Sequence, residues 1–401
     1  MNYIPRPYYV EKIKPFVGKQ IIKVLTGQRR VGKSYIMLQL MDTITANEPD
    51  ANIIYINREL EKFLWIKTYE NLYSYIKENI KKDKQNYLFI DEIQDISDFQ
   101  LALRSLLAEN ECDITCTGSN ANMLSGELAT FLGGRYIEFT IHSLNYLEFL
   151  TFHRLENTQA NLLKFLTYGG MPYLINIPLS DNLPFEYLKN IYGTILLKDI
   201  VARENIRNIS FLENLVHYLA DNIGNLFSAN NISKFLKSQQ INITPALTIN
   251  YLKSLTNAFF IHKVVRTEIA GLKIFEIGEK YYFEDIGLRN SIVGFNQRTD
   301  VHKLLENVVY LHLVSQDFNV KVGQIGNKEI DFIGEKNGLK IYIQVALQIT
   351  DKQTEQREFG NLMQIQDNYP KYVVVFNDLI IGNDYQGIKH INLKEFLSMT
   401  L

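Results

Sequence analysis

The chain has 401 residues, of which 46% are hydrophobic and 21% are charged, and its formal net charge at pH 7 is −2. These values indicate a globular protein long enough for two to four domains, and they exclude a polycation that binds nucleic acid over its whole surface. The two cysteines, Cys112 and Cys116, are too few for a disulfide framework, and no second Cys/His cluster completes a zinc site.

The N-terminal segment, residues 1–16, contains early prolines and charges instead of the apolar core of a signal peptide. No apolar run in the chain approaches the roughly 20 residues that a membrane-spanning helix requires. We therefore expect a cytoplasmic protein that has no membrane partner.

Residues 26–35, TGQRRVGKSY, lie between an apolar run that predicts a strand, IIKVL, and a segment with helical apolar spacing, IMLQLMDTI. The glycines of the pattern G-x-x-x-x-G-K-[ST] let backbone N–H groups face a phosphate, and the following helix directs its positive end toward it. Lys33 would reach the β- and γ-phosphates, and Ser34 would bind Mg²⁺. A chance loop is the alternative, but the strand and helix on either side favour an ATP-binding loop formed by Gly27, Gln28, Arg29, Arg30, Val31, Gly32, Lys33, Ser34 and Tyr35.

The second motif is NYLFIDEIQD, residues 86–95. Its apolar part predicts a fully buried strand, and Asp91 and Glu92 follow at the carboxyl end, where ligands bind in open α/β sheets. Asp91 would hold Mg²⁺ through water, and Glu92 would orient or deprotonate the attacking water. A solvated pair of acids at a strand end is the alternative, but the ATP-binding loop about 60 residues upstream favours the catalytic interpretation.

Two further strands are predicted at residues 51–57 and 112–118, and Ser119 follows the second of them. A hydroxyl at the tip of that strand would contact the γ-phosphate or the attacking water. Alternatively, Ser119 and Asn120 would only cap the next helix, because both residue types are favoured at that position. The residues themselves leave these two interpretations open.

Arg135 begins another short predicted strand within residues 133–150. An arginine at this position would sense the γ-phosphate or stabilise its charge during hydrolysis. The alternative is a surface arginine that pairs with Glu138 or Glu148, and the residues alone slightly favour this alternative.

Residues 146–205 carry helical apolar patterns, and the strongest of them is FHRLENTQANLLKFLTYGG. The segment GGMPY at 169–173 indicates a helix stop. We expect these helices to form a small lid over the nucleotide.

Residues 228–266 predict a short helix, a turn, a second helix that starts near Thr244-Pro245, and then a β-run. Proline is favoured at a first helical position, and the order of elements is that of a winged helix-turn-helix. The stretch has no acidic residue, so its positive charge would fit the phosphates of duplex DNA. The alternative is a connecting domain with a solvated basic face; the cations are Lys234, Lys237, Lys253, Lys263 and Arg266.

One known family has motifs that resemble those of this chain, in the same order: IPRPYY, LTGQRRVGKS, YLFIDEIQ, TGSNANML, GGRYIEF, YGGMPY, KYYFEDIGLRN, LLENVVYLHL, EIDFI, YIQVA and DNYPKYVV. It consists of AAA+-type P-loop ATPases of archaea and bacteria with a C-terminal domain of unknown function, in which a winged helix precedes a restriction-endonuclease-like fold. The resemblance covers nearly the whole chain. It implies that Arg6, Ser119 and Arg135 lie near the nucleotide, with Ser119 as a sensor-like residue.

Nucleases of the restriction-endonuclease-like class place an Asp on one strand and Glu-x-Lys on the next, and the two carboxylates hold Mg²⁺. Here Asp331 takes the first position, but Gln344 and Ala346 stand where the glutamate and the lysine are expected. A neutral amide is a poor Mg²⁺ ligand, and alanine has no charge. Glu306 remains as an outer ligand, whereas Lys340 precedes the strand. We therefore predict that the fold is retained and that the nuclease activity is lost.

The predicted fold class is α/β, with an AAA+-like P-loop domain (1–145), a helical lid (146–205), a winged helix (206–290) and a restriction-endonuclease-like domain (291–401). We predict an enzyme that binds ATP and Mg²⁺, hydrolyses ATP to ADP and phosphate, and passes its nucleotide state to a C-terminal half for which duplex DNA is a candidate partner. An ATP-gated nuclease and an ATP-binding protein-interaction module are the alternatives. A homo-oligomer or another protein partner is equally compatible with the motifs.

Overall fold

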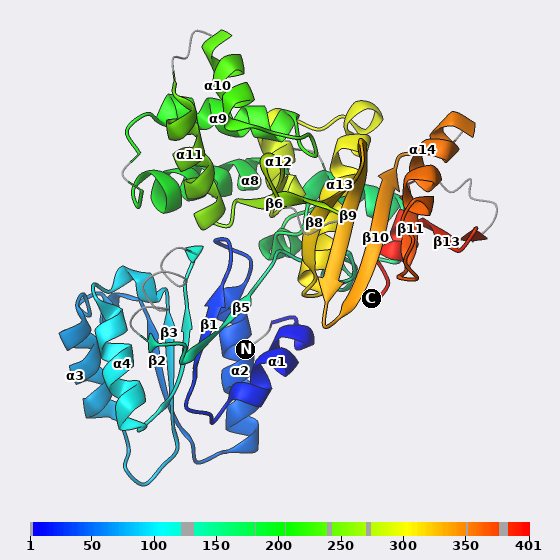
Figure 1. Cartoon of the computed structure of the whole chain (residues 1–401). Coiled ribbons are helices and arrows are strands. Elements are labelled where there is room, and N and C mark those ends of the chain that lie inside the picture. The colour runs from blue at the N-terminus through cyan, green and yellow to red at the C-terminus, as the bar shows by residue number, and fades with distance from the viewer. Residues whose placement is uncertain are drawn as a thin grey trace. The chain divides into compact units, whose positions relative to one another are not determined.

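The computed structural model describes residues 3–121, 132–180, 182–204, 206–238, 243–269, 274–349, 352–376 and 384–401 (Figure 1). The chain forms two compact units, residues 1–143 with 257–259 and residues 144–256 with 260–401. The division lies close to the boundary that the sequence predicts at residue 145. Among the described residues, no helix is both long and apolar enough to cross a membrane.

The first unit is built on a five-stranded sheet in the order β2-β3-β4-β1-β5, and all neighbouring strands are parallel. The predicted ATP-binding loop, which is called the nucleotide loop below, follows the strand that lies between β4 and β5. The elements are α1 (Pro7–Ile13), η1 (Lys14–Phe16), β1 (Ile22–Thr26), α2 (Lys33–Asn47), β2 (Asn52–Asn57), η2 (Glu61–Phe63), α3 (Tyr69–Asn79), β3 (Asn86–Asp91), η3 (Ile93–Asp95), α4 (Phe99–Glu109), β4 (Asp113–Thr117) and β5 (Tyr136–Thr140).

Helices cover both faces of this sheet, which explains why its strands read as continuous apolar runs. Successive residues of β3 point to opposite faces. Leu88 and Ile90 pack with the helices α3 and α4, whereas Tyr87 and Phe89 pack with α1 and α2. Burial on both faces holds the carboxyl end of β3, and with it Asp91, in a defined position.

A buried ion pair lies at the amino-terminal end of the sheet, away from the nucleotide loop. The ammonium of Lys23 on β1 contacts the carboxylate of Asp113 on β4, and the two side chains are 0% and 4% exposed. The Lys23 ammonium also donates to the Ile21 carbonyl oxygen at 3.3 Å, and the Gly18 N–H donates to the second oxygen of Asp113. This pair joins two neighbouring strands inside the sheet, where an unpaired charge would be costly.

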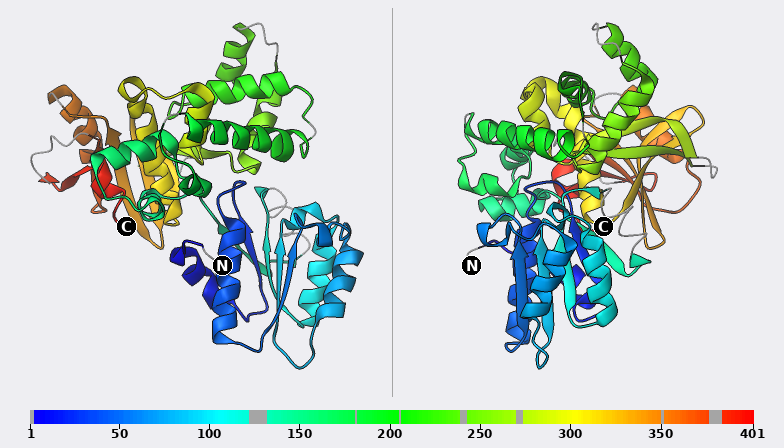
Figure 2. Two further views of the ribbon diagram at one scale, coloured as in Figure 1. Left: turned by 180° about the vertical axis from the view of Figure 1, so that it is seen from behind. Right: turned by 90° about the vertical axis from the view of Figure 1, so that its left-hand side faces the viewer.

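The second unit combines helices with an eight-stranded mixed sheet in the order β12-β13-β11-β10-β9-β8-β6-β7. Figures 1 and 2 show α9, α10 and α11 grouped at the β7 end of this unit, away from β11 and β13. The elements are α6 (Tyr146–His153), α7 (Gln159–Tyr168), η5 (Pro172–Asn176), α8 (Leu183–Thr194), η6 (Ile195–Val201), α9 (Ile209–Asp221), α10 (Ala229–Ser238), α11 (Pro245–Asn257), β6 (Ile261–Glu268), β7 (Ile274–Phe283), α12 (Ile286–Val293), α13 (Gln297–Ser315), β8 (Asn319–Ile325), β9 (Lys328–Lys336), β10 (Leu339–Ala346), α14 (Lys352–Met363), β11 (Lys371–Val375), β12 (Asp384–Tyr385), β13 (Ile388–Asn392) and α15 (Leu393–Phe396).

The domain boundaries predicted at residues 205 and 290 do not separate compact units. Strand β6 pairs in parallel with β8, so that Arg266 lies opposite Val322, and β6 also pairs with β7. The strands assigned to a winged helix therefore continue the sheet assigned to a nuclease-like domain. Strand pairing across about 55 residues is a tertiary interaction that local apolar patterns do not encode.

Two motifs that lie far apart in the sequence form one junction in the second unit. Asp285, from the EDIGLRN segment, accepts the Gly170 N–H at 2.7 Å and the Leu288 N–H at 2.9 Å, and thereby caps α12. The Asn290 amide donates to the carbonyl oxygens of Leu166 and Thr167 at 2.8 and 2.9 Å. The GGMPY segment therefore packs directly against α12, in addition to ending α7.

Candidate nucleotide-binding site

The loop between β1 and α2 has the backbone shape that its glycines allow. Gly27 and Gly32 have φ values of +135° and +101°, which side chains rarely adopt. A Cβ on Gly27 would lie 2.2 Å from the carbonyl oxygen of Ile141, so the loop can pass this close to the end of β5 only with glycine. Lys33 starts α2, and its ammonium donates to the Gly27 and Gln28 carbonyl oxygens at 2.9 and 3.0 Å.

The remaining loop residues differ in exposure. Val31 is fully buried, Arg30 is exposed with φ +72°, and Tyr35 is 57% exposed on the first turn of α2. Arg29 lies 3.9 Å from the Glu59 carboxylate. Gln28 is fully buried, and within the described part of the chain neither atom of its side-chain amide has a hydrogen-bond partner, although such groups usually have one.

Ser34, Asp91 and Thr117 form a hydrogen-bonded network that joins the loop to the end of β3. The Asp91 carboxylate accepts from the Ser34 hydroxyl and from Thr117 Oγ1, the latter at 2.5 Å. Thr117 Oγ1 in turn accepts the backbone N–H of Glu92 at 2.9 Å. Burial raises the pKa of Asp91, because the carboxylate loses hydration there, while the two hydroxyl groups act in the opposite direction.

Glu92 lies directly beside this network, in a left-handed conformation with φ +57° and ψ +51°. Its carboxylate accepts a hydrogen bond from the amide of Gln94 and lies 3.5 Å from the Ser119 hydroxyl. Ser119 is 1% exposed and follows β4. The structure thus brings Asp91, Glu92 and Ser119 to one edge of the sheet, where the sequence predicts them.

Thr117 and Gln94 are not among the site residues that the sequence predicts. A signal for Thr117 exists in the strand order: β4 lies next to β3, and Ile90 pairs with Cys116, so the next residue of β4 adjoins Asp91. That signal requires the knowledge that β4 lies between β1 and β3. The motif DEIQ contains Gln94, but without the turn at Glu92 the direction of its side chain does not follow from the letters.

Arg6 is buried, although it lies close to the N-terminus of the chain. Its guanidinium donates to the carbonyl oxygens of Val31 and His142 at 3.0 Å and lies 4.6 Å above the Tyr9 ring. Its backbone N–H donates to Gln39 at 2.8 Å. These contacts show Arg6 supporting the backbone of the nucleotide loop; direct contact with the nucleotide stays a prediction.

Arg135 does not lie near the nucleotide loop of its own chain, which corrects the expectation from the sequence. The carbonyl oxygen of Arg135 accepts the N–H of Ile22, the first residue of β1, at 3.1 Å, and its side chain is exposed. The nucleotide loop follows Thr26, the last residue of β1. Four residues of a strand span about 13 Å, so Arg135 lies at the opposite edge of the sheet, because parallel strands begin at the same edge.

The residues at the carboxyl edge fit a nucleotide with Mg²⁺. Ser34 and Asp91 supply the hard oxygen ligands that Mg²⁺ prefers, and they adjoin the N-terminus of a 15-residue helix that favours phosphate. The buried Asp91 carboxylate would be stabilised by a divalent cation, which lowers the pKa of an adjacent acid. The orphaned amide of Gln28 provides polar atoms that a bound phosphate or its water could pair.

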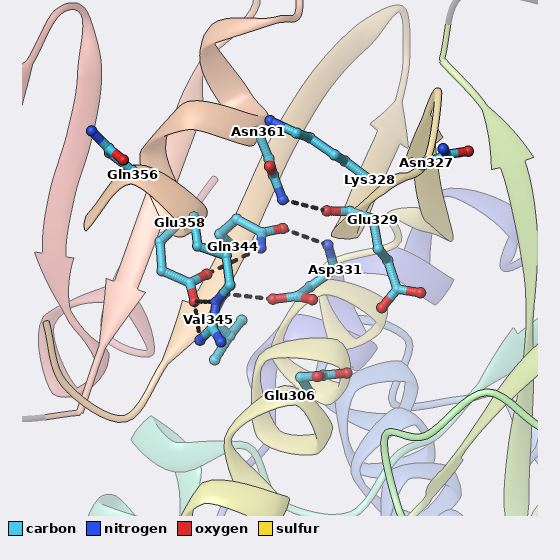
Figure 3. Close-up of a pocket in the computed structure, with 11 residues that line it drawn as sticks. Glu306, Asn327, Lys328, Glu329, Asp331, Gln344, Val345, Gln356, Glu358 and Asn361 are labelled. Atoms are coloured by element: carbon cyan, nitrogen blue, oxygen red, sulfur yellow. Dashed lines mark hydrogen bonds and ion pairs between the residues drawn. The ribbon is translucent and has the colours of Figure 1, made fainter. Parts of the chain in front are cut away.

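A second polar site lies in the C-terminal unit, in a pocket around Asp331 (Figure 3). Gln344 accepts the Asp331 N–H at 2.8 Å and donates to Glu358 of α14 at 3.1 Å. The Val345 N–H donates to the Asp331 carboxylate at 2.8 Å. Gln344 therefore bridges two acidic residues, where the nuclease pattern would have a third carboxylate.

The pocket contains more carboxylates than the sequence analysis expected. Glu306 and Glu329 both pair with the buried ammonium of Lys280 on β7, at 2.8 Å each, and Glu358 pairs with Arg357 at 2.6 Å. The sequence prediction of lost nuclease activity considered Asp331 and Glu306 only, whereas Glu329 and Glu358 also line the pocket.

These carboxylates are nevertheless compensated within the protein. In the described part of the chain, no three of them bring oxygen atoms within 4.8 Å of one another. Burial and the nearby Glu306 charge raise the pKa of Asp331. The carboxylates of this pocket are paired within the protein, and the neutral Gln344 bridges Asp331 and Glu358. The loss of nuclease activity stays a prediction.

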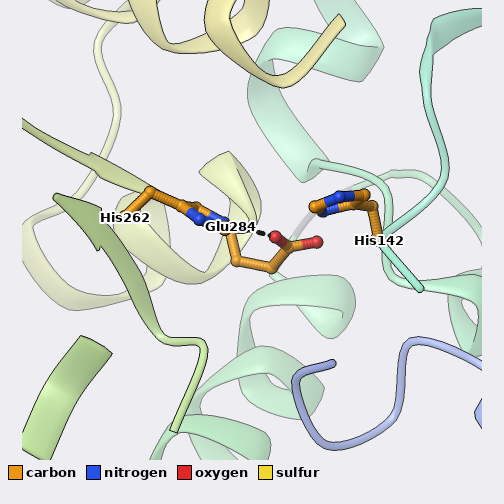
Figure 4. Close-up of side chains that lie close together, drawn as sticks. All are labelled: His142, His262 and Glu284. Carbon is orange, nitrogen blue, oxygen red and sulfur yellow. Dashed lines mark hydrogen bonds and ion pairs between the residues drawn. The ribbon is translucent and has the colours of Figure 1, made fainter. Parts of the chain in front are cut away.

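Glu284 and His262 form a separate buried pair in the same unit (Figure 4). The His262 Nε2 atom lies 2.6 Å from the Glu284 carboxylate, whose side chain is 1% exposed. Glu284 directly precedes the Asp285 cap of α12. The pair therefore links β6 to the junction between α12 and the GGMPY segment.

Comparisons with known proteins follow the division seen in the structure. A family model described as an AAA domain matches residues 19–150, and a model described as a domain of unknown function (DUF8612) matches residues 159–299. An uncharacterized protein of Haemophilus influenzae is 33% identical over 403 residues, which cover 98% of each chain. The uncharacterized protein MJ1544 of Methanocaldococcus jannaschii is 30% identical over 376 residues, covering 89% of this chain and 82% of its own.

Among solved structures, the Aeropyrum pernix ORC1 protein in complex with DNA matches 73% of this chain and 93% of its own, at 10% identity and a TM-score of 0.34. This similarity is too weak to support an inference about DNA. The AAA-domain match includes the five parallel strands and the loop between β1 and α2. It confirms the prediction of an AAA+-like P-loop domain.

Proposed function

This chain contains an AAA domain and belongs to one family with its relatives in Haemophilus influenzae and Methanocaldococcus jannaschii, and from this premise we propose that it is a Mg²⁺-dependent ATPase whose hydrolysis cycle drives its C-terminal unit. The observation that carries the proposal is the network from Ser34 through Asp91 and Thr117 to Glu92. It joins a phosphate-binding loop to a carboxylate that can accept a proton.

Each residue has a distinct task in this proposal. The loop N–H groups and Lys33 hold the phosphates, and Lys33 leaves the carbonyl oxygens of Gly27 and Gln28 to do so. Ser34, directly, and Asp91, through water, would hold Mg²⁺, which would supply positive charge beside the phosphates. Glu92 accepts a proton from water as the water oxygen bonds to the γ-phosphorus and the bond from that phosphorus to ADP breaks.

The proposal predicts that Lys33→Ala weakens nucleotide binding and abolishes hydrolysis. The variant loses the ammonium group at the first residue of α2, whereas the loop backbone is unchanged. We expect the affinity for a fluorescent ATP analogue with Mg²⁺ to fall at least about tenfold, since a charge-assisted contact contributes about 1.5–3 kcal/mol. Lys19→Ala, an exposed lysine before β1, is the matched control. Wild-type protein that neither binds the analogue nor releases phosphate from ATP would refute the proposal.

Arg135 is proposed to act on the nucleotide of a second copy of the chain, because its own loop lies at the other edge of the sheet. We expect Arg135→Ala to lower kcat more than ATP affinity. Mixing Arg135→Ala with Lys33→Ala protein should restore part of the turnover, since one subunit then offers an intact loop and the other an intact arginine. Loss of stability without a change in kcat would identify a surface arginine with a structural role only.

The C-terminal unit is proposed to contact duplex DNA through a winged helix formed by α9, α10, α11, β6 and β7. The order of these elements and the antiparallel bridge between Phe227 and Glu279 support this assignment. Residues 239–242 lie outside the described residues. Lys234, Lys237 and Lys253 are exposed, whereas Lys263 pairs with Glu279 at 2.5 Å.

A protein partner is the second candidate for this surface. Helix α11 would be the recognition helix, and it exposes Leu247 by 37% and Ile249 by 54%. Base edges are read mainly by polar side chains, and apolar contacts reach only the thymine methyl group. Two exposed aliphatic side chains on the helix therefore favour protein contact over base-specific reading.

A DNA-binding titration separates the two candidates. If Lys234, Lys237 and Lys253 each touch a phosphate, log affinity for duplex DNA should fall with log salt at a slope of roughly −0.9 per contact. Changing all three residues to Glu should abolish binding. Lys81, Lys82 and Lys84, three lysines in a loop of the first unit, provide the control set. Absence of binding by the wild type at about 50 mM salt would favour the protein partner.

The same DNA samples test the proposal that the nuclease-like domain does not cut. We expect no cleavage of plasmid or linear DNA with Mg²⁺ or Mn²⁺, because the carboxylates around Asp331 are paired inside the protein. Cleavage that Asp331→Ala abolishes would establish the ATP-gated nuclease instead.

A further inference from the structure

Gln94 contacts two residues of the proposed catalytic set. It lies in η3, two residues after Glu92, and its Nε2 atom donates to the Glu92 carboxylate. The same nitrogen lies 3.4 Å from the Ser119 hydroxyl. Its Oε1 atom is buried, and within the described residues it has no hydrogen-bond partner. The NH₂ group of the amide therefore has hydrogen-bond partners, whereas its carbonyl oxygen has none among the described residues.

The orientation of this amide follows from chemistry. An ionised carboxylate only accepts hydrogen bonds, so the NH₂ group must face Glu92 and the carbonyl oxygen must face the other way. A buried carbonyl oxygen without a donor costs about 1–3 kcal/mol. Such groups are rare in folded proteins, and each calls for an explanation such as a catalytic role.

The backbone explains how Gln94 reaches back to Glu92. Glu92 adopts φ +57° and ψ +51°, and the following residues form a short 3₁₀ turn. This turn brings the side chain two positions further along the chain to the carboxylate. Non-glycine residues in this conformation store strain and cluster at active sites.

Building on the proposed ATPase function, we propose that Gln94 positions the attacking water together with Glu92. Its Nε2 holds the Glu92 carboxylate, and its Oε1 accepts one O–H of the water whose other O–H donates to Glu92. The proton passes to Glu92 when the water oxygen bonds to the γ-phosphorus, and Gln94 neither gains nor loses a proton. Gln94 is thus a positioning residue, and the attacking water supplies the donor that Oε1 lacks.

A purely structural brace of η3 is the competing explanation, and a double-mutant cycle with Glu92 distinguishes the two. We would measure kcat by phosphate release, the Kd of a fluorescent ATP analogue with Mg²⁺, and thermal unfolding. The variants are Gln94→Ala and Gln94→Met, each alone and combined with Glu92→Gln. Gln94→Met keeps the side-chain length and protects the test from a folding defect. Gln20→Ala, on the segment before β1, is the control glutamine.

We expect both single variants to lower kcat about 10- to 100-fold, which is less than the roughly 10²- to 10⁴-fold effect of a group that transfers the proton itself, with Kd changed less than about threefold. In the Glu92→Gln background the same changes should lower the residual rate less than about threefold, because residues that act as one unit are not additive. Rates that multiply in the double variant, or a kcat equal to that of the wild type, would overturn the inference.

The wild-type and Gln94-variant measurements also distinguish failure of the Gln94 role from failure of the proposed ATPase function. A wild type that binds the nucleotide without hydrolysing it refutes the ATPase proposal and, with it, the role of Gln94. A wild type that hydrolyses ATP, together with fully active Gln94 variants, refutes the role of Gln94 alone.

Discussion

Glu92→Gln is expected to bind ATP with Mg²⁺ about as tightly as the wild type while hydrolysing it about 10²- to 10⁴-fold more slowly. In the proposed mechanism, binding uses the loop, Lys33, Ser34 and Asp91, whereas the proton of the attacking water passes to Glu92. Glutamine keeps the size of the side chain and the acceptor for the Gln94 amide, but it cannot take up that proton. Phosphate release measured beside equilibrium binding of a fluorescent ATP analogue reports both quantities.

Glu109→Gln provides the matched control for this variant. Glu109 ends α4 in the same unit and pairs with Lys77 at 3.2 Å, and it is exposed. We expect its kcat to stay within about twofold of the wild type, since exposed ion pairs contribute little. Equal turnover by Glu92→Gln and the wild type would remove Glu92 from its role. A stable ATP-bound Glu92→Gln protein would also be suited to isolating the partner of the C-terminal unit.

The second large effect is expected for stability. Lys23→Met should destabilise the first unit by about 3–5 kcal/mol at pH 6, where Lys23 carries its proton although burial lowers its pKa to about 7, because the change leaves the Asp113 carboxylate buried without its cation. Asp113 would retain only the Gly18 N–H as a described donor. Adding Asp113→Asn should recover part of the loss, since asparagine is neutral and still accepts that hydrogen bond. Denaturant unfolding of the wild type, Lys23→Met, Asp113→Asn and the double variant, compared by midpoint and slope, measures the effect.

Lys14→Met is the matched control for Lys23→Met. Lys14 forms an exposed pair with Glu11 at 3.7 Å, so the same substitution should change stability by less than about 1 kcal/mol. If Lys23→Met and Lys14→Met unfold at the same denaturant concentration, the buried pair contributes no more than a surface pair. If the variant with both Lys23→Met and Asp113→Asn loses as much unfolding free energy as Lys23→Met and Asp113→Asn lose in sum, Lys23 and Asp113 are not coupled.

The predictable part of the site consists of residues whose neighbours lie close in the sequence. The loop from Gly27 to Ser34 is local, and its glycines, lysine and serine carry their roles in their spacing. Asp91 and Glu92 end a strand whose apolar run is visible in the letters. Both motifs meet because parallel strands bring their carboxyl ends to one edge of a sheet. The resemblance to a known family added the prediction that Ser119 is a sensor-like residue.

The parts that could not be predicted depend on strand order and on turns. Gln94 reaches Glu92 only through a left-handed turn, and Thr117 meets Asp91 only because β4 lies beside β3. The position of Arg135 also depends on strand order, but here the strand order separates the residue from the site. Its place at the start of β5 puts it away from the nucleotide loop of its own chain, although its motif suggested otherwise.

The C-terminal unit shows the same contrast. Asp331 and Gln344 lie on neighbouring strands, and their pairing follows from a local β-hairpin pattern. Lys280, which neutralises Glu306 and Glu329, comes from β7, a strand that the apolar pattern assigned to a different domain.

The sequence by itself therefore determined the phosphate loop, the acidic strand end and the class of fold, because these depend on local conformation, apolar periodicity and spacing along the chain. Only the tertiary structure decided which strands are neighbours, how far one sheet extends, and which buried polar groups are paired. Those outcomes depend on the free energy of contacts between residues far apart in the chain, where a strand can pair with several apolar partners of similar pattern.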